Sequence, residues 1–137
     1  MTEVKKYKML INGSWTSGFE NNFFDSLNPF TGKTWSSIPS ASIKDVNFAV
    51  ESAHYAFSDG PWSKMTPTQR GSCLRKLALL LSEKSEKLGK TETIDTGKML
   101  KETRWQAKYI SEFFQFYAGC ADKISGETLP IDKPDLL

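Results

Sequence analysis

Residues 66–97, TPTQRGSCLRKLALLLSEKSEKLGKTETIDTG, give the chain its mainly helical character. Thr66 and Gln69 form a capping box around a proline, a combination that predicts a helix start. Apolar side chains then recur at helical spacing, namely Leu74, Leu77, Ala78, Leu81, Leu88 and Ile94. We expect a break or kink within residues 83–89, because one uninterrupted helix would exceed the usual length, and Gly97 is a natural C-terminal cap.

Two further helices are expected on either side of this stretch. Ser42 and Asp45 form a variant capping box, with aspartate in place of glutamate, ahead of a helix that ends at residues 59–61, DGP. Its apolar stripe consists of Val46, Ala49, Val50, Ala53 and Phe57. The last helix is expected over about residues 101–123. Its apolar residues step by three and four: Ile110, Phe113, Phe114, Tyr117, Ala121 and Ile124.

The first 40 residues have a different pattern, with short extended runs and turns. Residues 7–11 and 14–16 flank Asn12-Gly13, a strong signal for a two-residue hairpin turn. Residues 23–28 and 34–38 are further extended runs, and prolines follow both. The sequence therefore predicts an α+β chain, with strands and turns in residues 1–40, about four helices in 41–124 and an extended end in 125–137.

Composition excludes several classes of protein. The chain has 137 residues, 39% of them hydrophobic, and a net charge of +2, which argues neither for disorder nor for nucleic-acid binding by charge alone. No apolar run approaches the roughly 18 residues of a membrane span, and the amino terminus lacks the apolar core of a secretion signal. We therefore expect a cytoplasmic protein, in which Cys73 and Cys120 are free thiols.

The residue types that catalysis usually needs are sparse. His54 is the only histidine and is expected at the surface of a helix, and with two distant cysteines it makes no zinc site. Cys73 lies near Arg70 and Lys76, which could favour a thiolate. Because Cys73 also borders an apolar stripe, we interpret both cysteines as buried and inert.

Other motifs also favour structural interpretations. Gly97-Lys98 resembles the end of a phosphate-binding loop, but Met99 stands where such loops have serine or threonine. Residues 67–101 carry eight Lys or Arg against four Asp or Glu, and this mixture indicates a solvated helix face more than a nucleic-acid surface. We interpret the aromatic stripe of the last helix as core, since no polar groups accompany it to bind a ligand.

Several short segments, taken in order, resemble one known family. They are LINGSW (10–15), NPFTGK (28–33), AS-DV-AV (41–50), AHYAF (53–57), QR with LRKLA (69–78), ETIDTGK (92–98), YAGCADKI (117–124) and LPIDKPD (129–135). The set resembles the amino-terminal part of the NAD(P)-dependent aldehyde dehydrogenases. This resemblance implies a peripheral part of an α/β Rossmann-type coenzyme-binding domain, in a chain that stops before the Rossmann strands.

The resemblance also implies the chemistry of the complete enzyme. An aldehyde is oxidised to an acid through a thiohemiacetal and a thioester on a cysteine, with a glutamate as general base and an oxyanion hole of backbone N–H and asparagine. All of these residues and the coenzyme loop would lie beyond Leu137. Neither Cys73 nor Cys120 matches the family nucleophile, so we expect no catalytic and no cofactor-binding residue here, and an inactive chain.

One site of the family maps onto this chain. Its members hold a structural monovalent cation through positions that correspond to Ser26, Leu27 and Asp95, with a further ligand from a later helix. Hard oxygen ligands suit such an ion. The alternative is that Asp95 bonds the backbone around Gly97, as aspartates often do in turns.

The partners expected are the remainder of an aldehyde dehydrogenase chain and, for the full-length protein, a homodimer or homotetramer. We expect binding neither to nucleic acid nor to membranes. The competing hypothesis is a stand-alone helical interaction module without catalysis. A fragment would expose the aromatic face of its last helix, whereas a module would cover it.

Overall fold

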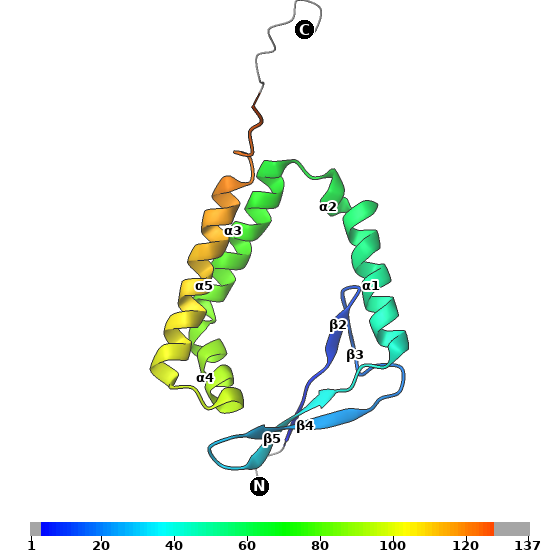
Figure 1. The fold of residues 1–137 in the computed structure, drawn as a ribbon, viewed down its shortest axis with the longest axis vertical. Helices are drawn as coiled ribbons and strands as arrows, with labels where there is room; N and C mark the ends of the chain where they lie inside the picture. The colour runs from blue at the N-terminus through cyan, green and yellow to red at the C-terminus, as the bar shows by residue number, and fades with distance from the viewer. Residues whose placement is uncertain (1–3, 128–137) are drawn as a thin grey trace, which may run out of the picture.

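The computed structural model describes residues 4–127, in which short strands precede a series of helices (Figure 1). A three-stranded sheet has the order β1-β5-β4. Strand β1 (Lys5–Lys6) runs parallel to β5 (Lys33–Pro39), and β4 (Phe23–Asn28) runs antiparallel to β5. The register between β4 and β5 shifts between Ser26 and Leu27, so a bulge lies at this point of the strand.

A separate hairpin follows β1. Strands β2 (Met9–Ile11) and β3 (Ser14–Thr16) are joined by Asn12 and Gly13, which have φ of 49° and 72° as a primed two-residue turn requires. The predicted hairpin is therefore confirmed, but its first strand is shorter than residues 7–11. The Tyr7 N–H donates to the Ser37 carbonyl at 3.0 Å, so Tyr7 stays with the three-stranded sheet before the chain crosses to the hairpin.

Helix α1 (Ile43–Ser58) starts at the predicted capping box. The Ser42 hydroxyl accepts from the Asp45 N–H, and the Asp45 carboxylate accepts from the Ser42 N–H at 2.8 Å. The same carboxylate accepts from the Phe19 N–H at 3.0 Å, although Asp45 is only 2% exposed. Asp45 therefore fixes the loop after the hairpin to the first turn of α1.

Four helices follow α1 in the described residues. The long helices α3 (Pro67–Glu83) and α5 (Leu100–Cys120) pack on one another, and α4 (Ser85–Thr96) packs on α5. The short helix α2 (Pro61–Lys64) lies between α1 and α3. The predicted break lies at Lys84, between α3 and α4, and the capping box at Thr66 is confirmed. Helix α2 was not predicted, and α5 ends three residues before the expected end.

Glycines allow the long helices to approach closely. A Cβ on Gly71 of α3 would lie 2.7 Å from the Ala118 carbonyl oxygen of α5, and one on Gly89 of α4 would lie 2.8 Å from the Arg104 nitrogen. Because the start of α3 meets the end of α5, these helices are antiparallel, as Figure 1 shows.

Few apolar side chains are buried in residues 4–127. Those that are comprise Ile11, Ala78, Ala107 and Ala118. The accessible surface is 11169 Å², whereas a compact monomer of this mass would expose about 7,200 Å². The stripe predicted for α1 is open, with Phe57 72% exposed, and so is the aromatic stripe of α5, with Phe116 65% exposed. The interpretation of the α5 stripe as core is therefore wrong for this chain.

Length and apolar character decide whether the helices of residues 4–127 could span a membrane. None of them is both long enough and apolar enough to cross a bilayer.

Candidate functional site

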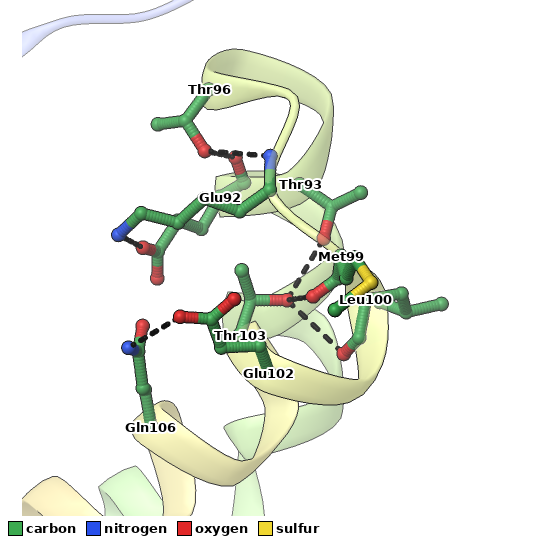
Figure 2. Close-up of polar contacts among 9 residues, drawn as sticks. Glu92, Thr93, Thr96, Met99, Leu100, Glu102, Thr103 and Gln106 are labelled. Atoms are coloured by element: carbon green, nitrogen blue, oxygen red, sulfur yellow. Dashed lines mark hydrogen bonds and ion pairs between the residues drawn. The ribbon is translucent and has the colours of Figure 1, made fainter.

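The junction between α4 and α5 is built around a buried hydroxyl (Figure 2). Gly97, with φ of 77°, ends α4, and the Thr103 N–H donates to the Met99 carbonyl as α5 begins. The Thr103 side chain is fully buried. Its Oγ1 lies 2.8 Å from Thr93 Oγ1 and donates to the Leu100 carbonyl at 3.2 Å. Hydroxyls from two helices thus satisfy one another inside the junction.

A charged rim surrounds this junction. Lys98 Nζ lies 2.8 Å from Glu92 Oε1, and this contact, with a smaller contribution from Glu102, raises the pKa of the Lys98 ammonium. Gln106 Nε2 in turn donates to Glu102 Oε1 at 3.3 Å. The ammonium of Lys98 is therefore held by a carboxylate of its own junction.

Asp95 joins the helical part to the sheet. Its Oδ1 accepts from Ser26 Oγ at 2.5 Å and from Trp35 Nε1 at 3.1 Å. The Gly97 N–H donates instead to the Thr93 carbonyl. The alternative prediction, that Asp95 bonds the backbone around Gly97, is therefore wrong.

The cation positions expected from the sequence are partly brought together. Ser26 and Asp95 are in direct contact, although 69 residues separate them in the chain. Leu27 follows Ser26 where the register between β4 and β5 shifts, because Trp35 is an extra residue on β5 between their partners Ser36 and Thr34. Carboxylate, hydroxyl and backbone oxygens are suitable ligands for a hard cation, but these few oxygens make only part of a coordination shell. Within residues 4–127, no group of three or more His, Cys, Asp or Glu side chains could hold a metal ion.

A large cavity opens beside Asp95, between the sheet and the helices. Its volume is about 720 Å³. The polar part of its lining is Ser26, Trp35, Thr91, Glu92 and Asp95. The apolar part is Tyr7, Phe24, Ile38, Leu81, Leu88, Ala107 and Ile110. This cavity was not predicted from the sequence, because its lining comes from five separate elements and one loop residue.

The candidate catalytic side chains do not meet. His54 is exposed, as expected, and its Nε2 lies 3.5 Å from Ser58 Oγ on the same helix. Cys73 and Cys120 are free and only half-buried, so they are less enclosed than expected. In the part of the chain that the structure describes, neither cysteine forms a hydrogen bond with His54 or with a carboxylate. No nucleophile paired with a base is therefore seen in residues 4–127.

Turns that hold a dinucleotide have a recognisable form. Such cofactors bind where a glycine-rich turn leads from a strand into a helix. The glycines with positive φ are Gly13, Gly18, Gly32 and Gly97. Among the described elements, the strand-to-helix connection runs from β5 to α1 through residues 40–42, which contain no glycine. This connection of the described residues is therefore not a glycine-rich turn.

The exposed face of α5 carries an aromatic series. The rings of Trp105 and Tyr109 stack with centroids 4.8 Å apart, and Phe113 meets Tyr109 edge to face at 5.1 Å. Trp105 is 61% exposed. Aromatic side chains pack mainly on their own neighbours along this helix and leave one side uncovered.

Comparison with known proteins gives consistent matches. A sequence model described as the aldehyde dehydrogenase family matches residues 15–136. A protein of Acinetobacter baylyi named (Z)-2-((N-methylformamido)methylene)-5-hydroxybutyrolactone dehydrogenase is 44% identical over 133 residues, covering 97% of this chain and 27% of the relative. Aldehyde dehydrogenase family 2 member C4 of Arabidopsis thaliana is 34% identical over 99% of this chain and 27% of its own length.

Solved structures agree with these matches. An NAD+ complex of aldehyde dehydrogenase from Bacillus cereus has a TM-score of 0.89 at 35% identity, over 94% of this chain and 26% of that one. An NAD-dependent aldehyde dehydrogenase from Sinorhizobium meliloti has a TM-score of 0.87 at 28% identity, over 91% of this chain and 25% of that one. The chain thus spans about a quarter of the length of the relatives it matches.

Proposed function

Because the chain belongs to the aldehyde dehydrogenase family, we propose that it is the amino-terminal part of an NAD(P)-dependent oxidoreductase that converts an aldehyde to a carboxylic acid. The family match over residues 15–136 supports this proposal, and the fold similarity at a TM-score of 0.89 agrees with it. Since the relatives are about four times as long, the activity belongs to a longer polypeptide.

The chain alone is inactive and binds neither NAD nor NADP. Oxidation through a thioester requires a thiol nucleophile, a base and a hydride acceptor. The described residues offer no paired nucleophile, and their strand-to-helix connection has no glycine. What this part contributes is structural: it supplies helices and strands against which the coenzyme-binding domain is completed.

A chimera tests the proposed activity. The chain replaces the corresponding residues of the Acinetobacter relative, and NADH or NADPH formation is followed with a panel of aldehydes. We expect aldehyde-dependent coenzyme reduction by the chimera and none by the 137-residue chain above a heat-treated control. Turnover by the chain alone, or a folded chimera without activity on any aldehyde, would refute the proposal.

Ser26, Leu27 and Asp95 also contribute oxygen ligands to a structural monovalent cation in the complete protein. The direct contact between Ser26 and Asp95 supports this assignment. The remaining ligands come from later residues.

The cation proposal is tested by thermal unfolding of the chimera in sodium or potassium chloride and in choline chloride at equal ionic strength. A cation that binds only the folded state raises Tm. We expect that increase in Tm in the unsubstituted chimera. We also expect it in the control variant Asp25→Asn, which changes an exposed carboxylate on β4, next to Ser26. Asp95→Asn should abolish it, and an unchanged increase would exclude Asp95 as a ligand.

The complete protein is further proposed to be a cytoplasmic homodimer or homotetramer that binds neither nucleic acid nor membranes. The free state of Cys73 and Cys120 suits a reducing compartment. On the helices, Glu86 pairs with Lys90 at 3.1 Å and also with Arg104, which reduces the basic surface available to a nucleic acid. Light scattering of the chimera gives the oligomeric state, and retention on DNA at low salt would argue against this description.

A further inference from the structure

Trp35 reaches the cavity because it is an extra residue of β5. Its two neighbours on β5 pair with Ser26 and Leu27 of β4, so Trp35 itself has no partner on that strand. Successive side chains of a regular strand alternate between the two faces of a sheet, and Trp35 and Ile38 would then lie on opposite faces. Both of them line the cavity, because a bulge redirects the side chain of the inserted residue.

The indole of Trp35 is fixed by contacts on two sides. Its ring meets Tyr7 edge to face, with centroids 6.0 Å apart, and the Tyr7 N–H donates to the Ser37 carbonyl of the same sheet. Trp35 Nε1 lies 3.1 Å from Asp95 Oδ1 and 3.2 Å from Ser26 Oγ. One N–H is therefore directed at side-chain oxygens of two of the three residues that we assign to the cation.

These two oxygens already use most of their lone pairs. Asp95 Oδ1 accepts from the indole and from the Ser26 hydroxyl, which lies 2.5 Å away, and a carboxylate oxygen has about two lone-pair sites. A cation that bridges Asp95 Oδ1 and Ser26 Oγ needs a lone pair from each of them. The positive end of the indole N–H already lies within hydrogen-bond distance of both oxygens, and it repels another positive charge.

The indole N–H and a cation are thus alternative partners for the same oxygens. We propose that Trp35 competes with the structural cation for Asp95 and Ser26 and lowers its affinity, an inference that rests on the cation of the proposed function. When no cation is bound, the indole joins β5 to α4 through Asp95. When the cation binds, it displaces the indole N–H and forms this link itself.

Thermal unfolding of the chimera at increasing sodium chloride concentrations tests the competition, with choline chloride keeping the ionic strength constant. The rise in Tm gives the half-saturating sodium concentration, because a ligand of the folded state stabilises it by mass action. Trp35→Phe keeps an aromatic ring beside Tyr7 and removes the donor, and Trp35→Leu is a second variant without the donor, used if the first does not fold. Trp15→Phe is the matched control, because it makes the same change at an indole that is 67% exposed on the separate hairpin.

We expect Trp35→Phe to lower the half-saturating sodium concentration about tenfold, as the loss of a donor to a charged oxygen predicts, and Trp15→Phe to leave it unchanged. An unchanged concentration in Trp35→Phe would mean that the cation binds without displacing the indole, and would overturn the competition. A higher concentration would also overturn it, because Trp35 would then position Asp95 for the cation.

A response of the unsubstituted chimera to sodium separates this inference from the assignment of the cation. If neither the unsubstituted chimera nor Trp35→Phe gains stability in sodium, the cation and the competition are both wrong. If both gain it at the same sodium concentration, the competition alone is wrong. Aldehyde-dependent coenzyme reduction by the same chimera, measured separately, decides the proposed activity in either case.

Discussion

At the scale of single residues, Asp45 connects two segments that the sequence keeps apart. Its carboxylate accepts hydrogen bonds from Ser42 and Phe19, and these bonds, the Ser42 hydroxyl first, lower its pKa. A carboxyl whose pKa is lowered by folding stabilises the folded state above its ordinary pKa of 3.8, and this contribution disappears as the pH falls below that value.

We therefore expect Asp45→Asn to lower the stability of the chain at pH 7 and to flatten the loss of stability below pH 3.8. Urea unfolding across this pH range measures both effects. Glu51→Gln, an exposed change on the same helix, is the control and should retain the full acid dependence. An acid profile of Asp45→Asn that superimposes on that of the unsubstituted chain would show that Asp45 is not linked to folding.

The hydroxyl pair of Thr93 and Thr103 leads to a second prediction at this scale. Thr103→Val keeps the shape of the buried side chain but leaves Thr93 without its partner, and we expect a loss of about 1–2 kcal/mol in the free energy of unfolding. The double variant with Thr93→Val should lose less than the sum of the two single variants, because both partners are then apolar. Additive losses in denaturant unfolding would mean that the two hydroxyls act separately.

At the scale of elements, the contact between α3 and α5 depends on a missing side chain. A methyl group on Gly71 would lie 2.7 Å from the Ala118 carbonyl oxygen, so we expect Gly71→Ala to separate the helices at a cost of about 1–3 kcal/mol. Gly119→Ala is the matched control, because no atom lies within 4 Å of its added Cβ, and it should be neutral or stabilising by up to about 1 kcal/mol. Thermal unfolding distinguishes them, and equal effects would argue against close packing at Gly71.

Helix starts, turns and breaks that depend on neighbouring residues could be predicted from the sequence. The contacts between distant elements could not. The capping boxes at Ser42 and Thr66, the hairpin turn at Asn12 and the break after Glu83 all follow from residues within a few positions of each other. The pairing of β1 with β5 joins distant residues through the backbone, so periodicity cannot reveal it. The contact between Ser26 and Asp95 was expected only from the family resemblance.

At the scale of the whole molecule, the apolar stripes of α1 and α5 were found correctly but their burial was not. A periodic stripe shows which side of a helix will be covered, and the covering group can belong to another part of the polypeptide. Here the sheet and the helices leave Phe57, Phe116 and the cavity wall at Leu88 open. The sequence pattern and the exposed surface are both explained if the described residues are one portion of a larger fold.

The fluorescence of a hydrophobic dye tests this central claim most directly. A natively helical 137-residue chain should bind the dye strongly, because its core-forming side chains are uncovered, and the signal should fall to a background level in the chimera with the remainder of the Acinetobacter relative. A helical, cooperatively unfolding chain that binds no dye would instead be a complete stand-alone module, and would contradict the account.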